Sequence, residues 1–108
     1  MSGSSTSWDP EPPRTPCDRL SFKTVVNSPV PTVLANVKVG DCLDVVIDQS
    51  QGRKVVVVLH QGQILGSITV SGIPRLVECL DDGNSFKAEV LSIAGARCEV
   101  LVTPGNCP

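Results

Sequence analysis

Residues 54–69, KVVVVLHQGQILGSIT, contain the stretch that decides the fold. Residues 55–59 form an unbroken run of β-branched and aliphatic side chains, which favours a strand covered on both faces. Gln61 and Gly62 follow, and Gly62 can adopt a positive φ at no steric cost. Because residues 63–69 read as a second strand, this short link predicts a β-hairpin at the centre of a small sheet. Strict alternation in the second strand would place Ile64, Gly66 and Ile68 on one face.

Four other segments carry the apolar pattern of strands, and they are residues 20–26, 42–48, 85–93 and 97–103. The cleanest alternation is in residues 42–48, where Leu43, Val45 and Ile47 share the face expected to meet the core. In the last segment, residues 98, 100 and 102 are expected to point inward. Residues 20–26 alternate weakly and are expected to form an edge strand.

Periodicity predicts one packed helix, near residues 73–82. Ile73, Leu76, Val77 and Leu80 stand at i, i+3, i+4 and i+7 and make a single apolar stripe. Residue 71 or 72 is expected to cap its start, and Gly83 is suited to the left-handed position after its end. Residues 31–37, PTVLANV, read either as an extended segment or as a short helix that begins at proline, and we favour the helix.

These elements together predict a mainly β fold, a small antiparallel barrel of SH3-like or OB-like type. It is expected to contain about five to six strands, one packed helix and a short helix near residues 31–36. Residues 18–104 would form a single domain. Residues 1–17, rich in Ser and Pro, are expected to be a disordered tail, and residues 105–108 a second tail. Trp8 in the first tail is interpreted as an exposed residue in preference to a docking anchor.

The charge pattern limits the classes of partner. The formal net charge is −2, and among nine Lys and Arg residues only Arg53 and Lys54 are adjacent. Strong nucleic-acid binding needs clustered cations, and so does binding to an acidic membrane surface. No apolar run approaches the roughly 18–20 residues that span a bilayer. A membrane partner is therefore not expected.

The chain has five cysteines: Cys17, Cys42, Cys79, Cys98 and Cys107. The number is odd, no C-x-x-C occurs, and no apolar N-terminal segment indicates secretion. The sequence therefore predicts free thiols in a reducing, cytoplasmic setting. The cysteine nearest each end of the chain is expected to lie exposed in a tail, and Cys98 to be buried as a small apolar residue. A zinc site is not predicted, because the cysteines are spread over the whole chain.

No catalytic or cofactor site is predicted. His60 is the only histidine, so any Ser-His-Asp or Cys-His pair must use it. Asp44, Asp48 and Cys42 are the candidates to approach it across the sheet, but a half-exposed histidine at a strand end is the favoured interpretation. Asp44 and Asp48, like Asp81 and Asp82, are interpreted as solvated carboxylates and not as paired acids. No glycine-rich phosphate-binding motif occurs, and we do not expect an enzyme.

From residue 39 onward several short motifs match a known pattern. They are VGDCL at 39–43, GQILGSI at 62–68, Arg75-Leu76, LDDG at 80–83 and FKAEV at 86–90. This pattern resembles the HIRAN domain, a small β-barrel found in some DNA-remodelling helicases and alone in bacteria. The resemblance implies a barrel fold and binding to single-stranded DNA ends. The chain departs from the family at residues 48–55, DQSQGRKV, where an Asn-Pro-x-Asp motif is usual, and at Ser67, where a Tyr is usual.

Two functions remain from the sequence. The first is a non-catalytic interaction module that binds a protein partner through a sheet edge or the Pro-rich tail. The alternative is a weak single-stranded nucleic-acid-binding module that uses Arg53, Lys54, Ser67 and Lys87. Dispersed cations and the lack of stacking aromatics favour the first function over the second.

Overall fold

The computed structural model describes residues 16–50, 52–69 and 73–108. The predicted disordered tail up to residue 15, with Trp8, lies outside these ranges, and so do the predicted cap residues 71 and 72. The elements in chain order are η2 (Cys17–Arg19), β1 (Phe22–Val25), α1 (Pro31–Leu34), β2 (Cys42–Asp48), β3 (Val55–His60), β4 (Gln63–Ile68), α2 (Ile73–Asp81), β5 (Phe86–Ala94) and β6 (Arg97–Pro104).

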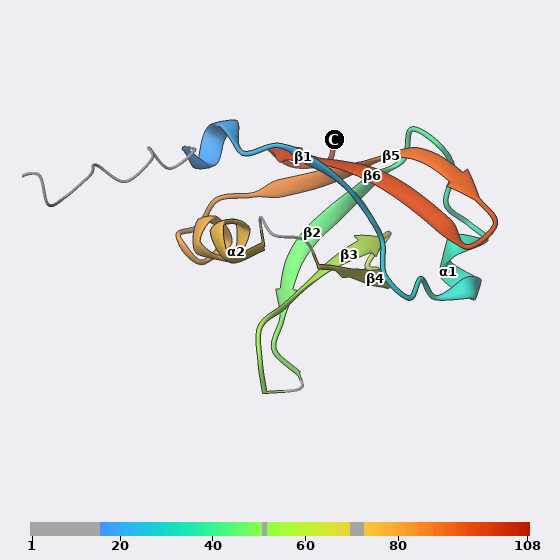
Figure 1. Cartoon of the computed structure of the whole chain (residues 1–108), viewed down its shortest axis with the longest axis horizontal. Helices are drawn as coiled ribbons and strands as arrows, with labels where there is room; N and C mark the ends of the chain where they lie inside the picture. Colours follow the sequence, from blue (N-terminus) through green and yellow to red (C-terminus); the bar gives the residue numbers. More distant parts are fainter. Residues whose placement is uncertain (1–15, 51, 70–72) are drawn as a thin grey trace, which may run out of the picture.

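The six strands form one antiparallel sheet in the order β1-β6-β5-β2-β3-β4. The sheet curls into a half-barrel, with α2 at one end and α1 at the other (Figure 1). The predicted fold class is confirmed: a mainly β, small antiparallel barrel with one packed helix and one short helix. The edge position predicted for the first strand is also confirmed.

The two edge strands of the curled sheet meet where the chain leaves β1. The backbone N–H of Asn27 donates to the carbonyl oxygen of Ser67 at 2.8 Å, and the N–H of Ser67 donates back at 3.2 Å. Farther on, the N–H of Val30 donates to the carbonyl oxygen of Leu65 at 2.7 Å. Residues 27–30 therefore lie along the outer edge of β4 and give it backbone partners that an edge strand lacks.

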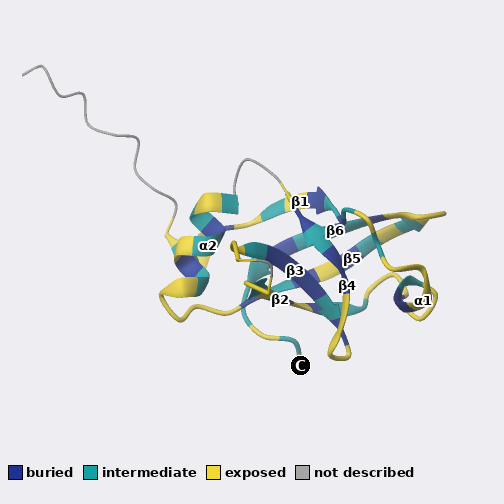
Figure 2. Ribbon diagram, turned by 90° about the horizontal axis from the view of Figure 1, so that it is seen from below, coloured by how far each residue is buried: buried dark blue, intermediate teal, exposed yellow. Residues whose placement is uncertain are grey.

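The core lies inside the curled sheet, where buried residues gather in β2 to β6 (Figure 2). Phe22 of β1 is partly buried and packs against this cluster. Leu43 and Val45 of β2 are buried as predicted, and so are the three inward residues of β6. Ile47, the third residue predicted for the inner face of β2, is only partly buried. The helices cover the ends of this core: Val33 of α1 and Leu76 of α2 are both buried. With only two Phe residues in the chain, the core consists almost entirely of Val, Leu and Ile.

The β3–β4 hairpin forms as predicted. Val56, Val57 and Val58 are all buried, which confirms a strand covered on both faces. The turn has positive φ at both central residues, 51° at Gln61 and 83° at Gly62. Two positive φ values characterise the type I′ turn that matches the twist of a two-residue hairpin.

A bulge in β4 breaks the alternation that the sequence predicts there. Val58 lies opposite Gly66, but Leu59 lies opposite Ile64, so Leu65 is an extra residue in its strand. Leu65 is consequently buried, whereas Ile64 points outward and is 46% exposed. The expectation that Ile64 shares a face with Ile68, which is buried, is therefore wrong.

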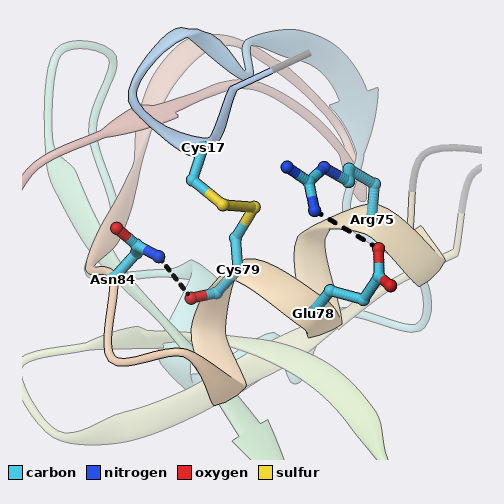
Figure 3. Close-up of a disulfide and its surroundings, with 5 residues drawn as sticks. All are labelled: Cys17, Arg75, Glu78, Cys79 and Asn84. Carbon is cyan, nitrogen blue, oxygen red and sulfur yellow. Dashed lines mark hydrogen bonds and ion pairs between the residues drawn. A yellow bond between two sulfur atoms is a disulfide. The ribbon is translucent and has the colours of Figure 1, made fainter. Parts of the chain in front are cut away.

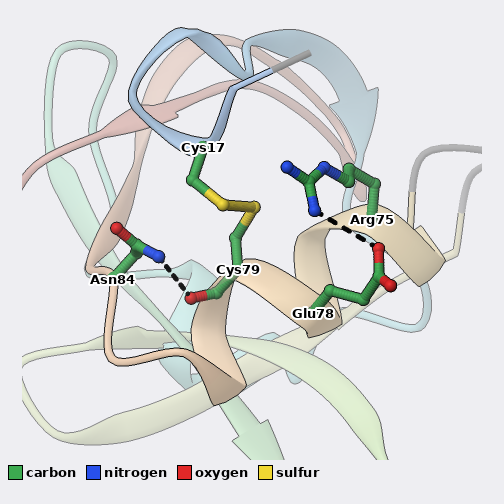
Figure 4. Close-up of polar contacts among 5 residues, drawn as sticks. All are labelled: Cys17, Arg75, Glu78, Cys79 and Asn84. Atoms are coloured by element: carbon green, nitrogen blue, oxygen red, sulfur yellow. Dashed lines mark hydrogen bonds and ion pairs between the residues drawn. A yellow bond between two sulfur atoms is a disulfide. The ribbon is translucent and has the colours of Figure 1, made fainter. Parts of the chain in front are cut away.

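Helix α2 ends in a Schellman motif. Gly83 has φ of 93°, and its N–H donates to the carbonyl oxygen of Leu80 at 3.1 Å. Asn84 donates to the carbonyl oxygen of Cys79 through its backbone N–H at 3.1 Å and through its side-chain amide at 2.9 Å (Figure 4). Within the predicted stripe only Leu76 is fully buried, and Cys79 is the second fully buried side chain of the helix.

Four cysteines form two disulfides, and this overturns the prediction of free thiols. Cys17 of η2 bonds to Cys79 of α2 (Figure 3), and Cys42 at the start of β2 bonds to Cys107. The partners are 62 and 65 residues apart in sequence, with Cα atoms 5.6 and 5.7 Å apart. The prediction failed because neither the odd number of cysteines nor the absence of a C-x-x-C motif carries information about distances in the folded chain. Only Cys98 is free, and it is buried as predicted.

The disulfides also change the interpretation of the chain ends. Cys17 and Cys107, both predicted to be exposed in tails, are fastened to α2 and β2. The N–H of Gly105 donates to the carbonyl oxygen of Ser85 at 2.9 Å, so the segment after β6 returns past β5 toward β2. The covalently held unit therefore extends from residue 17 to residue 107, beyond the predicted domain boundaries of 18 and 104.

Candidate functional site

The outer face of the hairpin carries apolar side chains that the core does not use. Val46 of β2 lies opposite Val57 of β3, and Val57 lies opposite Ser67 of β4, so these three residues form a row across the strands. This row faces away from the core, because the residues that alternate with it, such as Val45 and Val58, are buried within the core cluster.

A first cavity of about 230 Å³ opens on this face beside residues 27–30. Its apolar lining is Val30, Val55, Val57 and Ile64, and Asp48 and Ser67 are among its polar lining residues. Val30 is 38% exposed and Ile64 is 46% exposed. The neighbouring Val46 is 36% exposed. Exposed apolar side chains therefore surround the first cavity, on a solvent-facing side of the sheet where polar residues are usual.

A second cavity of about 330 Å³ adjoins the first. Both cavities are lined by Val55 and Ser67, so these two residues separate them. The second cavity adds two cations, Arg53 and Lys54, the hydroxyl residue Thr69, and the apolar residues Val56, Ile68 and Ile73. The two cavities together are called the outer groove below.

The charges of the outer groove are partly neutralised within the chain. Lys54 Nζ lies 2.5 Å from Asp81 Oδ2, and both side chains are nearly half exposed. Arg53 forms no ion pair with any residue in the described ranges. Asp48 accepts a hydrogen bond from the backbone N–H of Ser50 at 2.9 Å through Oδ1. The second cavity is therefore cationic, and a carboxylate lies beside the first.

The structure brings together three of the four residues predicted for nucleic-acid binding. Arg53, Lys54 and Ser67 all line the second cavity. Lys87 does not join them, because it lies on β5 opposite Asp44 and Thr103. The cationic patch within the outer groove therefore has two cations and not three.

His60 is buried, which corrects the prediction of a half-exposed histidine. Only 7% of the residue is exposed, and Nε2 lies 3.4 Å from Asp41 Oδ2. That same oxygen accepts a hydrogen bond from the backbone N–H of Lys38 at 2.8 Å. The carboxylate beside His60 is thus Asp41, which the sequence indicated only as part of a turn, and not Asp44 or Asp48. The contact joins β3 to the turn before β2.

Beyond the outer groove, the described ranges contain a further cavity but no cluster of metal ligands. No group of three or more His, Cys, Asp or Glu residues there has an arrangement that could hold a metal ion. No helix in that part of the chain is long and apolar enough to cross a membrane. A third cavity, of about 410 Å³, lies between α1 and the β5–β6 turn and is lined mainly by apolar residues, including Pro31, Leu34 and Ile93.

Sequence reasoning missed the outer groove. The exposure of Ile64 depends on the bulge in β4, and Val30 lies between the predicted segments 20–26 and 31–37, where no element was expected. The signal that was present is the apolar Val46 on the face opposite Leu43 and Val45. Comparison with protein-family models, with curated proteins and with solved structures finds no match to this chain.

Proposed function

We propose that this protein is a non-catalytic interaction module that binds a protein partner through the outer groove. The observation that carries the proposal is the set of exposed apolar side chains around the first cavity, on a sheet whose other face already supplies the core. Val30, Val46 and Ile64 contribute little to folding while they stay in water. An apolar side chain of a partner that enters the cavity would remove them from water.

The geometry is typical of protein interfaces. Their binding energy is concentrated in a few apolar or aromatic anchors that fill pockets, surrounded by a polar rim. Here the pocket is the first cavity, and Asp48 and Ser67 border it.

Site-specific photocrosslinking tests the proposal. A photoreactive amino acid is placed at Ile64, and in a matched control it replaces the exposed Arg97 at the start of β6, which lines neither cavity. We expect a defined crosslinked protein only with the Ile64 probe, and competition by excess unlabelled chain but not by its Val30→Asp variant. Equal crosslinking from both positions, or none from Ile64 in the source cell, would contradict the proposal.

We further propose an oxidising compartment for this function, in place of the cytoplasmic setting predicted from the sequence. That prediction depended on free thiols, and four of the five cysteines are paired. Protein disulfides form and persist in oxidising compartments and are rare in the cytosol. The partner is then expected to be a protein of the same compartment.

The HIRAN resemblance supports single-stranded nucleic-acid binding as a second candidate function. The observation that favours it is the convergence of Arg53, Lys54 and Ser67 on the second cavity. Two arguments weaken it. Lys54 already has an anionic neighbour, and none of the described residues that line either cavity is aromatic and able to stack on a base.

A further inference from the structure

We infer that the outer groove recognises a peptide segment in which an apolar side chain stands close to an acidic one. The apolar side chain enters the first cavity, and the carboxylate enters the second. The inference rests on the proposed function and specifies the chemistry of the partner. It follows from the position of the two cavities on either side of Val55 and Ser67.

The first cavity selects an apolar group. Val30, Val57 and Ile64 contribute side chains with no hydrogen-bonding atoms, so a polar group placed among them would lose its water contacts without compensation. Asp48 at the same cavity disfavours an acidic group there. The apolar and the acidic side chain can therefore bind in only one order across the groove.

The second cavity selects an anion. Arg53 has five N–H donors and no ion pair in the described part of the chain, and Ser67 and Thr69 add hydroxyl groups to the lining. Arg and carboxylate groups form charge-assisted, bidentate hydrogen bonds that are stronger than those between neutral groups. A partner carboxylate would thus find, beside the apolar cavity, a guanidinium that no described residue pairs with.

Lys54 forms an ion pair with Asp81 of the same chain. Its ammonium group lies 2.5 Å from Asp81, but exposed ion pairs of this kind contribute little stability. An incoming carboxylate therefore competes with Asp81 for Lys54. Replacing Asp81 with Asn would remove the competitor and leave the cation available to the partner.

A protein segment fits this arrangement better than a nucleic acid does. A polyanion draws its affinity from many phosphate contacts, and this groove offers two cations. One acidic side chain needs only one or two cations, and it leaves the apolar cavity to a neighbouring side chain. In an extended segment, side chains two residues apart lie on the same face, which brings both groups to the groove.

A defined peptide array supplies the test, with the full-length protein in its disulfide-bonded form. The peptides contain Leu and Asp separated by one to four Gly or Ser residues. In matched peptides Lys replaces Asp, or Ser replaces Leu. We expect at least one spacing at which the Leu–Asp peptide binds about fivefold or more tighter than its Leu–Lys and Ser–Asp counterparts.

Four variants connect the preference to the groove. Arg53→Gln should abolish the preference for Asp over Lys while Leu-dependent binding persists, and Ile64→Ser should weaken every Leu peptide. Asp81→Asn should increase the affinity for the Leu–Asp peptide about two- to fivefold. Lys87→Gln removes a cation outside the groove and should change nothing.

Equal binding of Asp and Lys peptides would overturn the inference, and so would a loss with Lys87→Gln as large as with Arg53→Gln, which would indicate general charge attraction. Displacement of the peptide by a short single-stranded DNA at submicromolar concentration would replace it with the nucleic-acid function. If Ile64 crosslinks a partner through a segment without acidic residues, the inference fails while the proposed function stands. If Ile64 crosslinks nothing, the proposed function itself fails.

Discussion

Gly66 lies so close to Val26 that a Cβ atom added to the glycine would be 2.5 Å from Val26 Cγ1. The same atom would lie 2.6 Å from the carbonyl oxygen of Asn27. The backbone oxygen cannot move aside as the end of a flexible side chain can. Glycine is therefore required here for the close approach of residues 26–29 to β4, and this approach joins the two edges of the sheet.

We expect Gly66→Ala to destabilise the protein by about 1–3 kcal/mol or more, because the added methyl group forces the two segments apart. Urea unfolding with the disulfides intact measures the change. Ser67→Ala is the matched control at the next position, where the partly exposed side chain lines the groove, and it should change stability by less than about 0.5 kcal/mol. Equal losses for the two variants would show that the close contact does not limit the fold.

The number of reactive thiols tests the disulfide pairing. Unfolding in denaturant without reductant should expose one thiol per chain, from Cys98, and unfolding with reductant should expose five. Digestion under non-reducing conditions should yield one peptide pair that contains Cys17 with Cys79 and another that contains Cys42 with Cys107. Five thiols without reductant would restore the prediction from the sequence.

Loss of either disulfide should lower stability substantially. Each closes a loop of more than 60 residues, for which the chain-entropy model gives about 4 kcal/mol. Chemical denaturation of Cys42→Ser/Cys107→Ser should show a loss of this order. A variant with unchanged stability would mean that the crosslink does not restrict the unfolded chain.

The sequence predicted the fold well because periodicity reports which faces are buried. Leu43 and Val45 of β2, the inward residues of β6 and the turn at Gly62 follow from local rules and are confirmed, whereas Ile47, predicted on the same face of β2, is only partly buried. The disulfides and the bulge at Leu65 follow from three-dimensional register, which no local pattern contains. The outer groove depends on that bulge and on the contact between Asn27 and Ser67, so it was not predictable for the same reason.

Leu76 should dominate the contribution of α2 to stability. It is fully buried, whereas Leu80 is only partly buried, so Leu76→Ala should cost about 2–5 kcal/mol and Leu80→Ala clearly less. Asp82→Asn serves as a control on the exposed helix end, where removing a negative charge should gain a few tenths of a kcal/mol. A larger loss for Leu80 than for Leu76, measured by denaturant melts, would mean that the helix is rotated.

Because of Cys98, the stability of the protein should decrease as the pH rises into the alkaline range. Burial raises the pKa of its thiol above the ordinary value of about 8.5. As the pH rises past that value, the unfolded chain releases a proton that the native thiol retains, so the free energy of unfolding falls. Calorimetry between pH 7 and 9.5, with repeat scans to exclude disulfide exchange, should show a larger loss for the native chain than for Cys98→Ala. If the stabilities of the unaltered chain and of Cys98→Ala fell in parallel with rising pH, the prediction would be wrong.

Binding to short single-stranded DNA or RNA should be weak and should show no preference for a free 3′ end. The net charge of −2 repels a polyanion, and the outer groove presents only Arg53 and Lys54. Each phosphate contact that is absent also removes the counterion release that drives such binding. Ser67 stands where the HIRAN pattern has a Tyr, and a missing stacking partner forfeits roughly 1–3 kcal/mol per base.

Fluorescence anisotropy with labelled oligonucleotides at near-physiological salt measures this affinity, with 3′-hydroxyl and 3′-blocked ends compared. Ser67→Tyr is the informative variant, because it supplies the aromatic ring at the boundary between the two cavities. If the missing ring limits binding, Ser67→Tyr should increase the affinity for the oligonucleotide. Because the ring would also fill the groove, the same variant should bind the Leu–Asp peptide more weakly. Submicromolar binding by the unaltered chain that disappears on blocking the end would make nucleic-acid binding the primary function.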